Sequence, residues 1–315
     1  MPAPRIVSLI ASATEIVDAL GQLDHLVGRS HECDYPEAVK SLPVCTRPRI
    51  SVDTDSREID RQVKERARTA VSIYDVFDEV LARLAPTHIL TQIQCEVCAV
   101  SLRDVEQALA RGIPGQPKIV SLQPDSLDKI WEDFRRVARA LDIPERGECI
   151  VTELQRRMTA LCPPPGAGPL PRVACMEWVE PLMAAGNWMP ELIRMAGGEN
   201  LFGENGRHSP GLIHELTWEQ LADADPDVAI VAPCGFDLER TAREMHWMTG
   251  RPGWSDLRAV RQGRVYLADG NRYFNRPGPR VVETLEALVE MLHPEFAAPR
   301  LRGEAWRVMA NPSGL

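Results

Sequence analysis

The chain has 315 residues, of which 44% are hydrophobic and 26% are charged, and its formal net charge at pH 7 is −9. This length suits two domains of ordinary size, and this composition is typical of a globular protein rather than a disordered or fibrous one. The acidic balance offers no basic surface to DNA or RNA, so we expect a small-molecule ligand and no nucleic-acid partner.

Location is predicted from the segments that the sequence lacks. The first residues lead directly into a short apolar strand, without the longer hydrophobic region and cleavage site of an export signal. No stretch reaches the roughly 20 apolar residues of a membrane-spanning helix. The eight cysteines are expected to be reduced thiols in so long a chain. We therefore expect a cytoplasmic monomer, or a periplasmic protein if the sequence lacks a native signal peptide.

The first half of the chain alternates strands with helices. A strand over residues 5–10 leads into a helix over 14–20, which the capping-box pair Ser12 and Glu15 begins and Gly21 ends. Further strands are predicted over 26–28, 88–93 and 118–122, and further helices over 76–84, 102–111 and 127–141. Such alternation predicts a mostly parallel sheet covered by helices.

The second half repeats this alternation after a helical run and a linker rich in proline and glycine. Its strands are predicted over 172–176, 228–231 and 264–267, and its helices over 189–196, 217–223 and 279–292. We predict an α/β fold with two Rossmann-like lobes. The predicted divisions are an N-terminal lobe over 1–144, a bridging helix and linker over 145–168, a C-terminal lobe over 169–293 and a tail over 294–315.

A pair of thiols, Cys95 and Cys98, follows the strand predicted over 88–93 and precedes a helix. The carboxyl ends of parallel strands are where α/β proteins bind ligands, and the first turn of a helix favours thiolate over thiol. Cys33, in the loop after the second strand, is expected at the same edge of the sheet. The three are candidate ligands of a zinc ion or an iron–sulfur cluster, with Cys45, Cys234 or His31 as a candidate fourth.

Two other interpretations of these thiols stay open. Cys95 and Cys98 are spaced like a dithiol redox couple, although such couples usually occur in a small domain with its own signature. Alternatively, the cysteines are small buried side chains that only pack.

Several short motifs occur in the same order as in a known family. They are Arg5-Ile6-Val7-Ser8-Leu9, Ala13-Thr14-Glu15, Leu20-Gly21, Val27-Gly28, Cys33-Asp34-Tyr35-Pro36, Leu84-Ala85-Pro86, Met195-Ala196-Gly197-Gly198-Glu199-Asn200, and Trp218-Glu219-Gln220 before Ala224-Asp225-Pro226-Asp227. Over residues 5–293 the chain thereby resembles the helical-backbone (class III) periplasmic-binding-protein-like family, and within it the vitamin B12 (cobalamin)-binding proteins of ABC importers. The resemblance implies two lobes joined by a single long helix, with the ligand in a cleft between them.

The resemblance also implies ligand contacts. Cobalamin is a large, flat macrocycle with amide edges, which requires apolar or aromatic faces and a few polar groups. Tyr273, Phe274 and Arg276 match a family segment that contacts the ligand, and Glu32 and Met183 stand where the family has aromatic contacts. A thiolate is a candidate axial ligand of the cobalt. The full set of expected contacts is Glu32, Cys33, Tyr35, Tyr74, Cys95, Cys98, Met183, Trp188, Tyr273, Phe274 and Arg276.

Glu79 and Glu219 align with two surface glutamates, one per lobe, that dock onto permease arginines in importer-associated relatives. Each carboxylate can accept a bidentate pair of hydrogen bonds from a guanidinium group. An ABC permease is an expected partner only if an export signal was removed. Otherwise the two glutamates are solvated helix positions.

The sequence carries no GxGxxG, GxxxxGK[ST], HExxH or GxSxG motif, so the common enzyme classes lack their local signatures. We predict a non-catalytic binding protein for a corrinoid such as cobalamin. The alternatives are a binding protein for haem or a siderophore chelate, and a protein with a cysteine-ligated metal, iron–sulfur cluster or redox couple.

Overall fold

The structure is a computed structural model that describes residues 3–68, 72–93, 100, 102–110, 116–164, 169–206, 216–295 and 299–310. The chain forms two compact units. The first comprises residues 1–54, 58–154 and 277–279, and the second comprises residues 55–57, 155–276 and 280–315. Within the described ranges, no helix combines the length and the apolar character that a bilayer-spanning segment requires.

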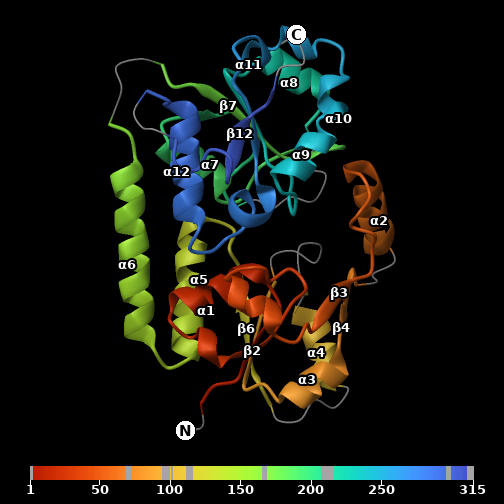
Figure 1. Ribbon diagram of the computed structural model, residues 1–315, viewed down its shortest axis with the longest axis vertical. Helices are drawn as coiled ribbons and strands as arrows, with labels where there is room; N and C mark the ends of the chain where they lie inside the picture. The colour runs from red at the N-terminus through yellow and green to blue at the C-terminus, as the bar shows by residue number, and fades with distance from the viewer. Residues whose placement is uncertain are drawn as a thin grey trace. The chain divides into compact units, whose positions relative to one another are not determined.

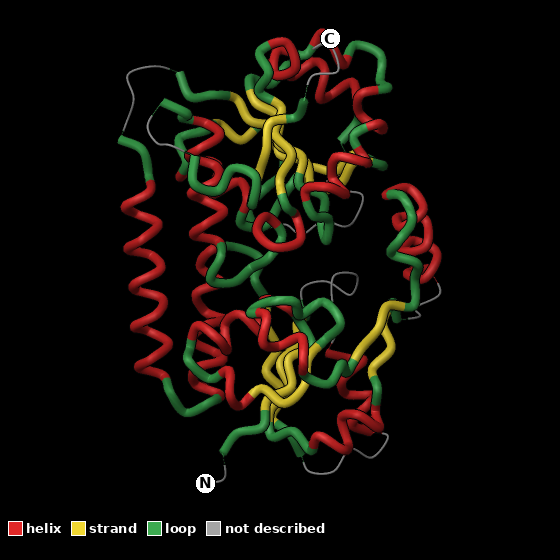
Figure 2. Tube along the Cα trace, viewed as in Figure 1, coloured by secondary structure: helices red, strands yellow, loops and turns green. Residues whose placement is uncertain are grey.

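The first unit contains a parallel sheet, as the alternation of strands and helices predicts (Figure 2). Its strand order is β2-β1-β5-β6, and each neighbouring pair is parallel. The strands are β1 (Ile6–Ser8), β2 (Leu26–Arg29), β5 (His88–Gln92) and β6 (Lys118–Leu122). The carboxyl ends of all four strands therefore lie at one edge of the sheet.

Helices lie on both faces of this sheet. On one face, α1 (Ala11–Ala19) packs against α5 (Leu127–Ala140). On the other, α3 (Asp78–Leu84) and α4 (Leu102–Ala110) bury Leu81 and Val105 in a cluster with Val7 and Ile89 (Figure 1). Apolar side chains on both faces of the strands make this the core of the unit.

The first unit also has an antiparallel pair of strands, β3 (Thr46–Pro48) and β4 (Tyr74–Val76). In sequence, α2 (Ser56–Arg68) lies between them. The sequence analysis did not predict α2, because most of its side chains are charged and the apolar signal reduces to a few positions such as Ile59 and Val63. Two short 3-10 helices, η1 (Leu23–His25) and η2 (Glu37–Ser41), flank β2.

The second unit is built on a mixed sheet with the strand order β12-β11-β10-β7-β8, and β9 also pairs with β7. The central strands β7 (Arg172–Val179), β10 (Val228–Val231) and β11 (Val265–Ala268) are parallel. The short β9 (Glu199–Asn200) is parallel to β7, whereas β8 (Leu182–Ala184) and β12 (Trp306–Val308) are antiparallel. Residues 299–310, part of the stretch predicted as a tail, thus contribute a strand.

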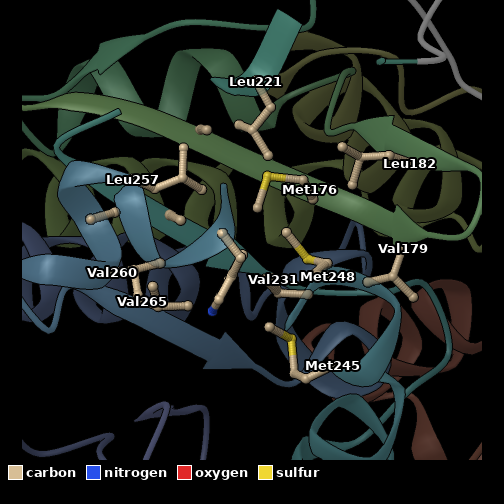
Figure 3. Close-up of a cluster of buried hydrophobic side chains, with 14 of the residues drawn as sticks. Met176, Val179, Leu182, Leu221, Val231, Met245, Met248, Leu257, Val260 and Val265 are labelled. Atoms are coloured by element: carbon tan, nitrogen blue, oxygen red, sulfur yellow. The ribbon is translucent and has the colours of Figure 1, made fainter. Parts of the chain in front are cut away.

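One face of this sheet is covered by α8 (Trp218–Ala224), α10 (His246–Thr249) and α11 (Arg258–Arg261). Figure 3 shows Leu221, Met248 and Val260 from these helices converging on Met176 and Val231 of the sheet. The remaining helices are α7 (Met189–Met195), α9 (Leu238–Glu244) and α12 (Val281–Leu292), with the 3-10 helix η3 (Trp254–Asp256). Among these, α7 packs against α12 and α9 against β11.

The predicted bridging helix is present as α6 (Pro144–Leu161). Its residues up to Leu154 belong to the first unit, and its residues from Gln155 belong to the second. Two short stretches, residues 55–57 and 277–279, belong to the opposite unit from their neighbours in sequence.

Residues 55–57 are fixed in the second unit by a buried carboxylate. The backbone N–H and the hydroxyl of Ser56 donate to Oε2 of Glu244 at 3.1 and 2.8 Å, and both residues are buried. The guanidinium of Arg57 lies 4.1 Å from the ring centroid of Trp247 and 3.2 Å from Glu180. Charge-assisted hydrogen bonds of this kind are among the strongest in proteins.

An arginine at the start of the first strand fixes the end of a helix in the first unit. Arg5 donates from Nε and Nη2 to the carbonyl of Leu84, the last residue of α3, at 3.0 and 2.7 Å. Its backbone N–H donates to Oγ1 of Thr87 at 2.9 Å. Ala85, which follows Leu84, has a left-handed φ of 42° and precedes a proline.

The second unit repeats this arrangement. Arg172, which begins β7, donates to the carbonyl of Ala224 at the end of α8 at 2.7 Å, and its backbone N–H donates to Oδ2 of Asp227 at 2.9 Å. Asp225 has a left-handed φ of 40° and also precedes a proline. The two units therefore join helix, proline and strand in the same way.

Candidate functional site

The turn after β11 is held against the loop after β10. This turn, Gly270–Phe274, is a π-helical turn whose N-cap Asp269 accepts backbone hydrogen bonds at 2.9 and 2.6 Å. A Cβ atom on Gly270 would lie 2.0 Å from the carbonyl oxygen of Pro233, so only glycine permits this approach. Both segments lie at the carboxyl edge of the second unit's sheet, where α/β proteins bind ligands.

Three predicted ligand contacts lie on or beside this turn, and all are buried: Tyr273 is 5%, Phe274 1% and Arg276 4% exposed. The Tyr273 hydroxyl donates to Oε1 of Glu304 at 2.7 Å, and burial, followed by this hydrogen bond, raises the pKa of the phenol. Arg276 donates from Nη2 to Oδ1 of Asn271 at 3.0 Å. The turn is therefore packed, and its polar groups have partners within the same unit.

Two further aromatic residues lie at this edge. Trp178, near the end of β7, and Phe236, after β10, have ring centroids 5.2 Å apart, and the Arg240 guanidinium lies 3.8 Å from the Phe236 centroid. The indole N–H of Trp178 lies within hydrogen-bonding distance of the carbonyl oxygens of Ser56 and Glu180, at 3.2 and 3.1 Å. With Tyr273 and Phe274, aromatic side chains thus lie at or just after the carboxyl ends of three neighbouring parallel strands.

Met183 and Trp188, also predicted as contacts, lie on and after β8. Met183 is opposite Trp178 in the antiparallel pair of β7 and β8, and it is 7% exposed. Trp188 is 4% exposed at the start of α7. Its indole Nε1 has no hydrogen-bond partner within the described part of the chain.

In the first unit, Cys33 lies just beyond β2 and is a packed thiol, 1% exposed. Its sulfur accepts a hydrogen bond from Oγ1 of Thr14 at 3.0 Å and lies 3.3 Å from Oγ of Ser30. Burial raises the pKa of this thiol, although both hydroxyl contacts act in the opposite direction. The protonated form therefore predominates at neutral pH.

The other thiols predicted as metal ligands have different surroundings. Burial raises the pKa of Cys45 to about 12, and Cys234 is exposed in the second unit. Cys95 and Cys98 lie outside the described residues. Across the described ranges, no group of three or more His, Cys, Asp or Glu side chains is arranged to hold a metal ion.

His31 lies between β2 and Cys33 and is bound to Thr46 of β3. Oγ1 of Thr46 lies 2.8 Å from Nδ1 of His31 and accepts the His31 backbone N–H at 3.1 Å. The imidazole ring is 5.6 Å from the ring of Tyr74, a predicted contact that is 7% exposed. Burial, with a smaller contribution from the charge of Arg29, lowers the pKa of His31 to about 4, so the ring is neutral at pH 7.

The two remaining predicted contacts of this unit are more accessible. The side chain of Glu32 is 37% exposed, with Oε1 at 3.8 Å from Nε2 of His31. Tyr35 is 46% exposed. The structure thus brings Glu32, Cys33 and Tyr74 close to His31 in the first unit.

The predicted docking residues occupy equivalent positions in the two units. Glu79 is the second residue of α3 and Glu219 the second residue of α8, and both are exposed. Each precedes a fully buried leucine, Leu81 or Leu221, by two positions. Hydrogen bonds from its own backbone N–H and from Thr217 lower the pKa of Glu219.

Sequence reasoning missed three residues that shape these edges: Thr46, Phe236 and Glu304. Phe236 had a signal, because it follows a predicted strand at the same sheet edge as Tyr273. Thr46 and Glu304 had none, since their partners, His31 and Tyr273, are 15 and 31 residues away in sequence.

Comparison with known proteins identifies relatives of the whole chain. The chain is 24% identical over 292 residues to the vitamin B12-binding protein of Vibrio vulnificus (strain CMCP6), which covers 92% of this chain and 90% of that protein. It is 23% identical over 292 residues to an ABC transporter substrate-binding lipoprotein of Bacillus subtilis (strain 168), covering 92% and 80%.

Solved structures share the fold. A periplasmic haem-binding protein from Pseudomonas aeruginosa superposes with a TM-score of 0.69 at 21% identity, covering 99% of each chain. A family model described as periplasmic binding protein matches residues 6–271, which is most of the sequence. The chain therefore belongs to the periplasmic binding protein family, in agreement with the motifs in its sequence.

Proposed function

We propose that this protein is a non-catalytic substrate-binding protein whose ligand is a corrinoid such as cobalamin. The observation that carries the proposal is the similarity, over 92% of the chain, to a protein described as vitamin B12-binding. The aromatic side chains at or just after the carboxyl ends of three parallel strands of the second unit support it, because a flat macrocycle requires apolar faces.

The proposed contacts in the second unit are Met183, Trp188, Tyr273, Phe274 and Arg276, and those in the first are Glu32, Tyr35 and Tyr74 with the predicted thiols. Because Tyr273 and Phe274 are nearly fully buried, their role is to shape a rigid wall. A wall that is ordered before the ligand arrives costs little free energy to organise.

Gel filtration tests this function directly. Purified protein is mixed with hydroxocobalamin at micromolar concentrations, and the visible spectrum of the protein peak is recorded after free ligand is removed. We expect corrinoid absorbance to co-elute at about one ligand per chain, and heat-denatured protein to retain none. A colourless protein peak would rule out the proposal.

Haem is the second candidate, because a solved structure with this fold is described as haem-binding. The same column run with ferric haem, and with a ferric siderophore, distinguishes these ligands. If the corrinoid proposal is right, excess haem does not displace bound hydroxocobalamin.

The thiols support a third candidate, a cysteine-ligated metal or redox centre at Cys95 and Cys98. Elemental analysis of protein purified without oxygen tests the metal centre, and a metal-free, colourless sample would exclude it. Cys95→Ser shows whether a thiolate contacts the corrinoid: an unchanged spectrum of the bound ligand would exclude axial coordination by this sulfur.

We also propose that the protein delivers its ligand to an ABC permease. The Bacillus subtilis relative is described as an ABC transporter substrate-binding lipoprotein, and Glu79 and Glu219 are exposed at equivalent positions of the two units. This role requires a location outside the cytoplasmic membrane. Cell fractionation followed by immunoblotting decides between storage in the cytoplasm and delivery to a permease.

A further inference from the structure

The proton on the His31 ring can be placed from the contacts of Thr46. The Thr46 hydroxyl is fully buried, and its hydrogen bonds within the described residues are both with His31. Its oxygen accepts the His31 backbone N–H, so its own proton points to Nδ1 of the ring. Nδ1 is therefore an acceptor, and the neutral imidazole carries its proton on Nε2.

This tautomer makes His31 a fixed donor rather than a metal ligand. The Thr46 contact and the Tyr74 ring at 5.6 Å hold the imidazole in place, and the His31 side chain is 24% exposed. A metal ion requires an unprotonated ring nitrogen, whereas Nε2–H is suited to a carbonyl oxygen.

Glu32 places an acceptor beside this donor. Its Oε1 lies 3.8 Å from Nε2 of His31, and its side chain is 37% exposed. A carboxylate offers about four lone-pair sites, so Glu32 can accept a ligand N–H in addition to its contacts within the protein. Arg29, the last residue of the preceding strand β2, donates to the backbone carbonyls of Ser30, Cys33 and Lys40.

We propose that His31 and Glu32 together bind a primary carboxamide of the ligand. The carbonyl oxygen of the amide accepts from Nε2–H of His31, and its NH2 group donates to the Glu32 carboxylate. A carboxamide carries its acceptor and its donor on one carbon atom, as this adjacent pair requires. The inference rests on the proposed function and specifies the ligand: a corrin with amide side chains rather than a macrocycle with carboxylates.

The pair discriminates by charge as well as by geometry. A ligand carboxylate, such as a haem propionate, would meet the negative charge of Glu32, and a His31 ring whose Nδ1 accepts from Thr46 carries no positive charge to offset it. It would also lack the N–H that Glu32 accepts. Specificity then comes from rejecting the wrong group in addition to binding the right one.

Two corrins that share one ring test the inference. Affinities for dicyanocobinamide, whose side chains are amides, and for dicyanocobyrinic acid, whose side chains are carboxylic acids, are measured by isothermal titration calorimetry. We expect the protein to bind the amide corrin at least about tenfold more tightly, which corresponds to one hydrogen bond and one avoided charge repulsion.

Variants assign this preference to the pair. We expect Glu32→Gln to reduce the preference roughly fivefold by strengthening binding of the acid corrin, and His31→Ala to reduce it by weakening binding of the amide corrin. His31→Gln, which keeps a neutral N–H donor, should retain most of it. His25→Ala is the matched control, because His25 precedes β2 whereas His31 follows it, and the preference should not change.

The ratio of the two affinities separates recognition from damage to the fold, since damage weakens binding of both corrins alike. Equal affinities of the unmodified protein for both corrins would overturn this inference and leave the corrinoid function intact. So would an unchanged ratio in both His31→Ala and Glu32→Gln. Failure to bind either corrin would overturn the proposed function and this inference with it.

Discussion

The cysteines of this chain differ in reactivity because their surroundings differ. Cys33 is 1% exposed, and burial raises its pKa, whereas Cys149 and Cys234 are exposed. Since the thiolate is the reactive form, a thiol that is both covered and protonated is inert. The position of Cys33 beyond a strand was predictable from the sequence, but its hydrogen bonds to Thr14 and Ser30 were not.

Alkylation of the native protein checks this difference. With iodoacetamide at pH 8, we expect Cys149 and Cys234 to react at least about tenfold faster than Cys33, because burial limits both access and ionisation. Peptide mass spectrometry measures each rate, and protein unfolded in urea is the control in which the rates converge. Rapid labelling of Cys33 in the native state would contradict the packed environment.

Asp133 gives the first unit a pH-dependent stability. It is 1% exposed on α5, where it accepts the Gln123 backbone N–H at 3.2 and 3.0 Å and contacts the Arg136 guanidinium. Burial nevertheless raises its pKa from 3.8 to about 7. The folded protein therefore binds this proton more tightly than the unfolded chain does.

The sign follows from proton linkage. Between about pH 4 and pH 7 the folded state holds more protons at Asp133, so this residue's contribution to the unfolding free energy falls by about 2–4 kcal/mol as pH rises. Urea unfolding measures the unfolding free energies of the parent protein and of Asp133→Asn at pH 5 and pH 7.5. The difference between the two proteins should show this fall. His31, whose folded pKa is about 4, acts in the opposite direction but cancels in that difference. Asp128→Asn, an exposed change on α5, is the control.

At the scale of elements, the turn after β11 depends on one glycine. Ala at position 270 would place Cβ 2.0 Å from a backbone oxygen, whereas Gly263 has open space around it but a φ of +67°. We expect Gly270→Ala to cost about 2–4 kcal/mol and to abolish corrinoid retention, and Gly263→Ala to cost about 1 kcal/mol with retention intact. Urea midpoints and the gel-filtration assay measure both. Wild-type retention by Gly270→Ala would remove this turn from the site.

The C-terminal strand depends on one carboxylate. Glu290 of α12 is 4% exposed and accepts from the backbone N–H groups of Arg300 and Leu301 and from the indole N–H of Trp306, the last at 2.7 Å. Because truncation leaves two buried donors and one partly buried donor without this acceptor, we expect Glu290→Ala to lower the unfolding free energy by about 3 kcal/mol. Equilibrium urea unfolding measures it, and the exposed Glu295→Ala should be neutral.

Most elements could be predicted because apolar runs alternate with amphipathic helices. The exceptions have physical reasons. In α2, charged residues at most positions hide the helical period, and β12 is a three-residue edge strand whose one buried side chain is Trp306. The π-helical turn at Gly270–Phe274 depends on contacts with the distant Pro233 loop, which no local pattern reveals.

At the scale of the whole molecule, the two units carry the same arrangement of helix, proline and strand. It places Glu79 and Glu219 at equivalent positions. A partner with two similar halves would need such a pair, because each half would contact one glutamate. The alternation of strands and helices predicted two similar halves, and the family resemblance predicted one surface glutamate in each. The sequence did not predict that residues 55–57 and 277–279 belong to the opposite unit, since that depends on contacts between residues far apart in the chain.

Charge reversal tests the docking proposal. We expect Glu79→Arg and Glu219→Arg each to reduce corrinoid uptake by cells about tenfold or more, because an arginine would repel a permease arginine. Binding of hydroxocobalamin by the purified variants should not change. Asp223→Arg, on the same helix as Glu219, is the control. Normal uptake by the double variant would rule out docking through these residues.

The contact of Ser56 with Glu244 means that the second unit cannot be produced intact as a single C-terminal fragment. A recombinant fragment beginning at Gln155 would omit residues 55–57, and the Glu244 carboxylate would then be buried without its two donors from Ser56. The second unit is therefore not one contiguous segment of the chain. Supplying the missing residues as a synthetic peptide should raise the melting temperature of such a fragment, as bound ligands do.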